Sequence, residues 1–154
     1  KNDVIYTSPS IRTIQSAMMV AKVFKKEYVV LDNLKTRACG EWNGLTFGQV
    51  LKKYPEGLAK ILAEPDKKTM AGAESSVEFI SRVKNVIDEL VAQNVGNRII
   101  IVTHPEVIQA AICAALDIPA DKLPKIFIRT GSATQISYFE DWASLVYSDY
   151  VPLG

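Results

Sequence analysis

The sequence is poor in the residues that disulfide frameworks and metal sites need. Its 154 residues include one histidine and two cysteines. Two thiols, Cys39 and Cys113, are too few to staple a domain of this size, and no group of histidine, cysteine and carboxylate residues has metal-ligand spacing. We therefore expect no metal and no other cofactor, and a reducing, cytoplasmic setting.

An excess of charge of one sign is also absent. Lys and Arg number 18 against 17 Asp and Glu, which leaves a formal net charge of +1 and no electrostatic reason to expect a nucleic-acid or membrane partner. No apolar run approaches the roughly 20 residues that cross a membrane. The 48% of hydrophobic residues predicts a globular chain, with one domain over residues 1–154 and no signal for its oligomeric state.

Apolar runs and helical patterns alternate along the chain. Strands are predicted at 4–7, 28–31, 99–102, 126–128, 134–139 and 144–150. Helices are predicted after Ser10, at 46–54, at 58–62, after the capping box at 75–78 and after His104, with an exposed loop at 65–73. The order predicts an α/β fold, a three-layer α/β/α sandwich with a mostly parallel sheet and an antiparallel C-terminal edge.

The first predicted helix carries a set of apolar residues that we expect on its inner side, with the hydroxyls of Ser8 and Ser10 capping its start. The inner residues expected there are Ile11, Ile14, Met18, Ala21, Val23 and Phe24.

The single histidine follows an apolar run and precedes Pro105, which fits the first position of a helix. His104 is therefore expected at the carboxyl edge of the sheet, where ligands gather and helix N-termini favour anions. Arg12 begins another helix after another strand, so the two side chains converge if their strands are neighbours. An arginine and a histidine together suit a phosphoryl group. From position alone, a surface arginine and a strand-end histidine bonded to its neighbours are equally good interpretations.

Four segments form an ordered set of motifs: 6–17 (YTSPSIRTIQSA), 40–46 (GEWNGLT), 73–75 (AES) and 101–104 (IVTH). In this order they resemble the histidine phosphatase superfamily, in particular its phosphoglycerate mutase-like branch. That branch includes cofactor-dependent mutases, fructose-2,6-bisphosphatases and α-ribazole phosphatases. The resemblance implies the same three-layer fold and a phosphomonoester hydrolase or phosphomutase that acts on a small phosphorylated substrate through a phosphohistidine intermediate.

The resemblance also assigns roles to residues. Arg12 and His104 correspond to the family's second arginine and second histidine, catalytic groups that hold the phosphoryl oxygens. Ser8 is implied as a further phosphate-binding residue, and Arg37 as a substrate-binding one. Trp42 is expected to pack its loop against the domain.

The proton donor is where this chain departs from the family. The family's acid falls at Thr36, and threonine is a poor acid at neutral pH. Glu41 and Glu106 are the two remaining candidate donors.

The nucleophile of the family, a histidine in an Arg-His-Gly motif, has no counterpart among these residues. The first residue is Lys1 rather than methionine, so we expect the chain to begin inside a longer product whose N-terminal strand and helix carry that motif. Without that strand, the sheet is expected to have an unfilled central position. Two functions stay open: an enzyme whose nucleophile lies outside these residues, and a non-catalytic phosphate-binding or regulatory module.

Overall fold

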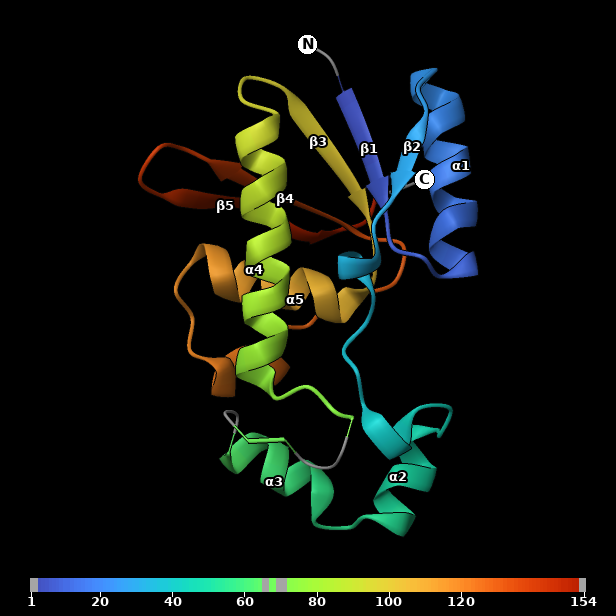
Figure 1. Cartoon of the computed structure of the whole chain (residues 1–154), viewed down its shortest axis with the longest axis vertical. Helices are drawn as coiled ribbons and strands as arrows, with labels where there is room; N and C mark the ends of the chain where they lie inside the picture. The colour runs from blue at the N-terminus through green and yellow to red at the C-terminus, as the bar shows by residue number, and fades with distance from the viewer. Residues whose placement is uncertain (1–2, 65–66, 69–71, 153–154) are drawn as a thin grey trace.

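Three parallel strands and an antiparallel hairpin form the sheets of the structure (Figure 1). A computed structural model describes residues 3–64, 67–68 and 72–152. The strands are β1 (Asp3–Thr7), β2 (Tyr28–Val30), β3 (Arg98–Val102), β4 (Ala133–Tyr138) and β5 (Ala143–Tyr150). The α-helices are α1 (Ile11–Phe24), α2 (Phe47–Lys53), α3 (Gly57–Ala63), α4 (Ser76–Gln93) and α5 (Pro105–Ala115), and the 3-10 helices are η1 (Asp32–Leu34), η2 (Gly40–Trp42) and η3 (Ala120–Lys125). Part of the loop predicted at 65–73 lies outside the described residues.

The parallel sheet has the order β2-β1-β3, with β1 in the middle. β1 pairs with β3 over its whole length, from Asp3 opposite Arg98 to Thr7 opposite Val102, and with β2 on its other side. β3 pairs with all of β1 and β2 pairs with its second half, Ile5 to Thr7, so there is no open position between the three strands. The expected unfilled position therefore does not lie between β2, β1 and β3. Because the β4–β5 hairpin forms a sheet separate from these strands, the expectation of a missing strand stays a prediction.

The C-terminal hairpin of β4 and β5 is antiparallel and forms a sheet of its own. The α/β fold with a parallel sheet and an antiparallel C-terminal hairpin is therefore confirmed. The strand predicted at 126–128 is wrong. That segment follows η3 and pairs with no other strand, although Ile128 is buried. Its apolar residues therefore indicated burial and not a strand.

The core lies between one face of the sheet and helices α4 and α5. Tyr6 joins it from β1, together with Phe79 and Val83 of α4 and Val107 of α5. α4 begins with the predicted capping box, in which Ser75 Oγ accepts the backbone N–H of Glu78 and the Glu78 carboxylate accepts that of Ser75. The apolar repeat of this helix predicts the burial of Val83, Val86, Ile87 and Leu90 correctly, but Val77, at the start of that repeat, is 48% exposed.

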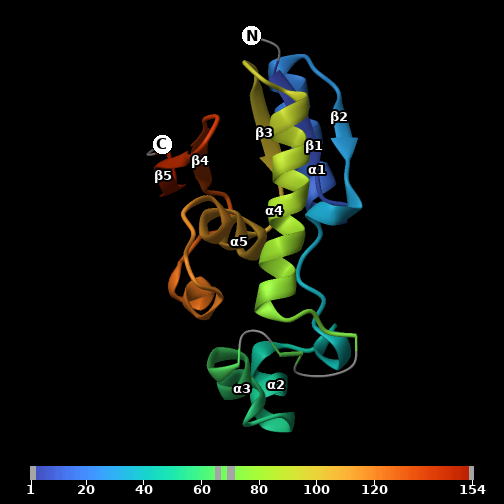
Figure 2. The ribbon, with the colours of Figure 1, turned by 60° about the vertical axis from the view of Figure 1, so that its left-hand side comes forward.

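The opposite face of the sheet is covered by α1 (Figures 1 and 2). Alternate side chains of a strand point to opposite faces, so Ile5, which is completely buried, lies on the α1 side of β1. The buried residues of α1 are Thr13, Ala17 and Ala21, spaced by four, and their small side chains let the helix approach the sheet closely.

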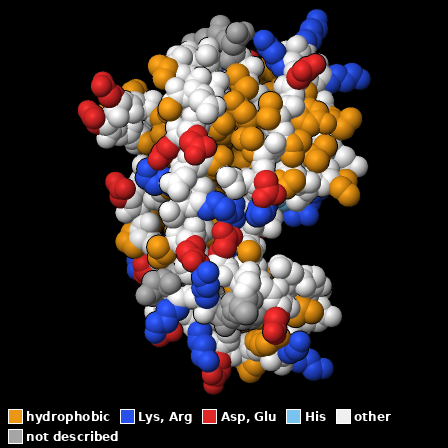
Figure 3. Space-filling view, in the orientation of Figure 1, with side chains coloured by type: hydrophobic (Ala, Val, Ile, Leu, Met, Phe, Trp, Pro, Cys, Tyr) orange, Lys and Arg blue, Asp and Glu red, His pale blue; other side chains and the backbone are white. Residues whose placement is uncertain are grey.

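The predicted inner side of α1 is wrong for three of its residues. Ile11, Met18 and Val23 are 77%, 55% and 78% exposed, because the stripe of small residues takes the inward position. Figure 3 shows hydrophobic side chains gathered over β1, β2 and α1.

α2 and α3 extend from the main body at its lower end in Figure 1. The Trp42 ring lies 5.8 Å from that of Tyr54, and a Cβ added at Gly57 would come within 2.5 Å of the Trp42 ring. Trp42 therefore packs its loop against this helical pair, as the sequence predicted, and glycine at position 57 makes room for it.

Candidate active site

The site lies where β1 and β3 end side by side. Thr7 and Val102 are register partners, and the Ser8 backbone N–H donates to Val102 O at 3.1 Å. His104 is the N-cap residue of α5, with Pro105 in its first turn. The parallel pairing brings both strand-to-helix junctions to one edge, so the expected neighbourhood of the two junctions is confirmed.

His104 is 4% exposed, and its ring contacts side chains from the other junction. Arg12 Nη2 lies 3.0 Å from Nδ1, and a guanidinium can only donate, so Nδ1 is an acceptor without a proton. The proton of the neutral ring is then on Nε2, which donates to Ser8 Oγ at 2.8 Å. The hydrogen-bond network thus assigns a neutral ring with a defined tautomer.

Burial lowers the pKa of His104, and the neighbouring Arg12 charge lowers it further. Both causes penalise the imidazolium form. Arg12 itself is exposed, so its guanidinium is accessible to a ligand while it contacts the buried ring. The structure therefore places a solvent-facing cation against a neutral histidine.

Hydroxyl groups surround the other side of the ring. Ser8 is fully buried, and its Oγ lies 2.7 Å from Thr13 Oγ1. Ser10 is the N-cap residue of α1, but its side chain makes no capping hydrogen bond, and its Oγ lies 3.3 Å from His104 Nε2. The predicted capping role of Ser8 and Ser10 is therefore wrong, because both hydroxyls turn toward the histidine instead. Thr13 had no signal in the sequence, since threonine in a first helical turn is common.

A group of side chains around Arg82 lies beside the Arg12–His104 pair. The Glu74 carboxylate accepts from Arg82 Nε at 2.7 Å and from the Ala38 backbone N–H at 2.8 Å. Burial alone would raise the pKa of Glu74, but the Arg82 and Ala38 hydrogen bonds outweigh it and lower the pKa. Arg82 also donates to the carbonyl oxygens of Asn33, Lys35 and Thr36. This ion pair fixes the segment that leads from η1 into the site.

Arg37 is held by this same group. Its Nε and Nη2 donate to the backbone oxygen of Glu74 at 2.9 and 2.7 Å, and burial lowers its pKa. Burial raises the pKa of the nearby Glu106 carboxyl, and the Arg37 backbone together with the charges of Arg37 and Arg12 offsets this in part. Arg37 and Glu106 are therefore neighbours, and the charge of Arg12 also acts on Glu106.

The remaining positions lie at the edge of this arrangement or beyond it. Thr36 is half-buried and accepts from Arg82 through its carbonyl oxygen. Glu41 accepts a hydrogen bond from the Tyr54 hydroxyl at 2.9 Å and is exposed. It therefore belongs to the packing of η2 on α2. The structure brings Glu106 near Arg12 and Arg37, and engages Glu41 with the helical pair.

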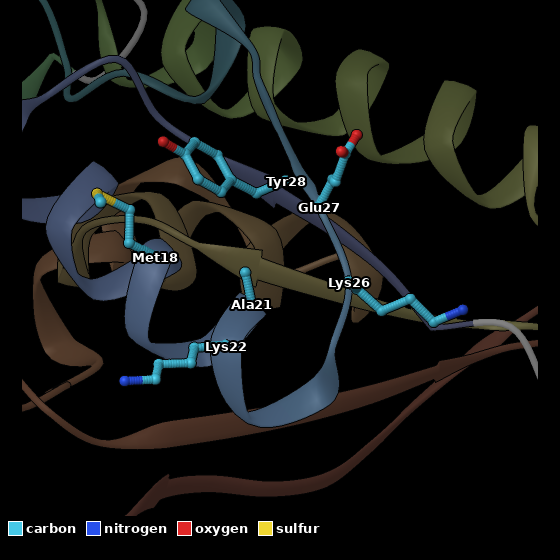
Figure 4. A pocket seen from close by; sticks show the side chains of 6 residues that line it. All are labelled: Met18, Ala21, Lys22, Lys26, Glu27 and Tyr28. Atoms are coloured by element: carbon cyan, nitrogen blue, oxygen red, sulfur yellow. The ribbon is translucent and has the colours of Figure 1, made fainter.

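In the described part of the chain, no group of three or more His, Cys, Asp and Glu side chains is arranged to hold a metal ion. None of the described helices has the length and apolar character needed to cross a membrane. A pocket between α1 and β2 contains none of the candidate residues (Figure 4). Its lining consists of Met18, Ala21, Lys22, Lys26, Glu27 and Tyr28.

The chain belongs to the histidine phosphatase superfamily (branch 1), whose family profile matches residues 1–149. Among curated proteins it is similar to phosphoserine phosphatase 1 of Hydrogenobacter thermophilus, with 31% identity over 120 residues, 78% of this chain and 57% of that protein. The chain thus spans a little over half the length of this relative. The resemblance read from the four motifs is confirmed.

Solved structures show the same fold. YhfR of Bacillus stearothermophilus is 22% identical with a TM-score of 0.87, over 97% of this chain and 74% of that one. A mutant phosphoserine phosphatase of Entamoeba histolytica in complex with phosphoserine is 22% identical with a TM-score of 0.84, over 96% of this chain and 73% of that one.

Proposed function

We propose that this chain forms the phosphoryl-binding part of a histidine phosphatase that removes or transfers the phosphoryl group of a small phosphomonoester. The observation that supports this most is the 3.0 Å contact between Arg12 and His104, which come from different strand ends. The forked donors of an exposed arginine suit phosphoryl oxygens, and the start of α5 adds a favourable dipole. In this proposal Arg12 and His104 stabilise the charge that develops on the transferred group.

The attacking histidine, in this proposal, is supplied by an N-terminal segment outside these 154 residues. The single histidine in the sequence is His104, and both of its ring nitrogens are engaged by Arg12 and Ser8. The attacking nitrogen forms a bond to phosphorus while the bond to the substrate oxygen breaks. Water then cleaves the phosphorus–nitrogen bond and releases inorganic phosphate.

Glu106 is the carboxyl group best suited to give a proton to the leaving oxygen. It lies two residues beyond His104 in the first turn of α5, and burial raises its pKa so that it holds a proton more readily. Glu41 is engaged by Tyr54, and Glu74 is engaged by Arg82. Arg37, next to Glu106, is placed to bind the part of the substrate beyond the phosphoryl group.

A phosphoserine-like substrate is supported by the similarity of this chain to two phosphoserine phosphatases. Phosphoserine is a small phosphomonoester whose alkoxide leaving group needs protonation, so a proton donor matters for it. Its carboxylate also fits an arginine such as Arg37.

The experiment that tests the enzyme is trapping of acid-labile phosphate on histidine, with the protein that includes the N-terminal segment and with phosphoserine as substrate. We expect label on a histidine of that segment. Glu106→Gln should lower turnover of phosphoserine by about 10² or more but leave that of p-nitrophenyl phosphate nearly unchanged, since nitrophenolate leaves without a proton. Glu41→Gln is the matched control and should change neither.

A non-catalytic phosphate-binding module is the second candidate, favoured by Thr36 at the position of the family's acid. In that case inorganic phosphate still binds, but no histidine is labelled and no phosphomonoester is hydrolysed. Trapped label would exclude this module, and its absence in a protein that binds phosphate would exclude the enzyme.

A further inference from the structure

A buried chain of hydroxyl groups runs away from His104. Nε2 lies 2.8 Å from Ser8 Oγ, which lies 2.7 Å from Thr13 Oγ1, which lies 2.8 Å from the backbone oxygen of Ser10. Ser8, Thr13 and His104 are 0%, 4% and 4% exposed. In this buried chain each hydroxyl has one proton to give, so the direction of each hydrogen bond fixes the next.

The direction in the structure is set by Arg12. Because Arg12 donates to Nδ1, the ring proton is on Nε2 and is donated to Ser8. The Ser8 hydroxyl then donates to Thr13 Oγ1, and the Thr13 hydroxyl donates to Ser10 O. In this direction every polar atom in the series of hydroxyl groups has a hydrogen-bond partner.

The opposite direction satisfies the two hydroxyls and Nε2 equally well. The Thr13 hydroxyl can rotate from Ser10 O to Ser8 Oγ, and the Ser8 hydroxyl can then donate to Nε2. The backbone oxygen of Ser10 then loses one hydrogen bond but keeps two, because the backbone N–H groups of Thr13 and Ile14 donate to it at 3.1 and 3.0 Å. In this second direction the ring proton is on Nδ1. The side chains of Ser8 and Thr13 need only hydroxyl rotation for this, but the Arg12 guanidinium has to leave Nδ1, because a protonated Nδ1 cannot accept its hydrogen bond.

We propose that Ser8 and Thr13 form a reversible hydroxyl relay that switches the tautomer of His104 when a phosphoryl group binds. The inference rests on the proposed function, because it needs a phosphoryl oxygen to draw Arg12 from Nδ1. An unprotonated Nδ1 would then face oxygen lone pairs, whereas Nδ1–H donates to them. Nδ1 gains a proton from solvent and Nε2 returns one to solvent, so the ring stays neutral. Thr13 is thus a positioning residue that acts through Ser8.

The test is NMR of the protein labelled with 15N-histidine and 15N-arginine at about pH 8, well above the ordinary histidine pKa. The His104 signals are identified by their loss in His104→Gln. We expect a protonated Nε2 in the free protein and a protonated Nδ1 with saturating inorganic phosphate. A spectrum in which phosphate leaves both nitrogens protonated, or leaves the tautomer unchanged while the Arg12 side-chain signals shift, overturns the relay.

The Thr13→Val variant tests the relay without any ligand. It keeps the shape of the side chain but removes the acceptor of the Ser8 hydroxyl, so Ser8 should turn its proton toward Nε2. We expect the ratio of the two tautomers in the free protein to change about five- to tenfold, the weight of one buried hydrogen bond. The control is Thr103→Val, since the Thr103 hydroxyl donates to Leu34 O at 2.9 Å and stands outside the relay.

The free-protein result decides the inference by itself. A tautomer ratio in Thr13→Val equal to that in Thr103→Val overturns it. If phosphate shifts neither the His104 nor the Arg12 signals, the proposed function fails, while the Thr13→Val result still reports on the relay.

Discussion

Two arginines near the site face opposite partners. The guanidinium of Arg82 lies on the carboxylate of Glu74, with their side chains only 16% and 21% exposed. The guanidinium of Arg12 lies instead on the neutral ring of His104 and is exposed to solvent. A buried arginine that is neutralised by a carboxylate of the protein stabilises the fold. An exposed arginine whose only partner in the site is a neutral ring keeps its charge available to bind an anion. The comparison separates the residue that builds the site from the one that binds.

Arg82→Met should have the largest effect, and that effect should be on stability. The substitution keeps most of the apolar stem but leaves the Glu74 carboxylate without its main partner, so the free energy of unfolding should fall by about 3 kcal/mol. Thermal unfolding should show a Tm lower by roughly 6 to 12 °C.

The control for Arg82 lies two residues further along the same helix. Lys84 pairs with Asp88 on the exposed face of α4, so Lys84→Met should cost under about 0.5 kcal/mol. Inorganic phosphate should bind folded Arg82→Met within about threefold of the unchanged protein. If Arg82→Met loses as much affinity for phosphate as Arg12→Ala does, both arginines take part in binding and the comparison fails.

Arg12→Ala should have the next largest effect, and that effect should be on binding. Loss of the forked donors should weaken phosphate binding about 100-fold, because a charge-assisted contact to the anion disappears. Stability should change by less than about 0.5 kcal/mol, as for most exposed positions. Calorimetric titration with inorganic phosphate and a thermal melt of the same sample measure the two quantities, and a large drop in Tm would move Arg12 to the structural side of the comparison.

The smallest effect concerns pH and the neutral state of His104. Burial lowers the pKa of this histidine in the native protein, so the unfolded chain takes up a proton first as the pH falls. The native state therefore loses stability below about pH 6.5, and this loss levels off below the lowered pKa.

The contribution of His104 is measured by comparing the pH dependence of stability in the unchanged protein and in His104→Gln. Glu106, with its raised pKa, contributes with the opposite sign, losing stability as pH rises from about 4.5. That contribution is present in both proteins, so it cancels in their difference. Denaturant unfolding between about pH 5 and pH 8 should show a flatter profile for His104→Gln. Equal slopes would mean that the pKa of His104 is the same in the native and unfolded states, so that folding does not disfavour its charged form.

The sequence predicted the neighbourhood of Arg12 and His104 because the prediction needed only topology. Both residues follow strands, and parallel neighbouring strands end at one edge. The same reasoning did not predict Thr13 or Arg82, whose importance comes from partners five and eight residues away, Ser8 and Glu74. Side-chain direction within a helix turn decides such contacts, and residue type alone does not.

The contrast between α4 and α1 shows a second limit. In α4 most of the apolar stripe is the buried stripe, as for Val83 and Leu90. In α1 close approach to the sheet favours Ala17 and Ala21, and the larger apolar residues face outward. Periodicity finds the buried side of a helix when volume and hydrophobicity agree, and misplaces it when the sheet leaves room only for small residues.

The central claim, that Arg12 and His104 together hold a phosphoryl group, is tested most directly by a crystal structure of the protein with inorganic phosphate. The account predicts a phosphate ion at the start of α5 with oxygens within hydrogen-bond distance of the Arg12 guanidinium and of His104 Nδ1. A phosphate ion bound elsewhere, with the Arg12–His104 contact unchanged, would contradict it.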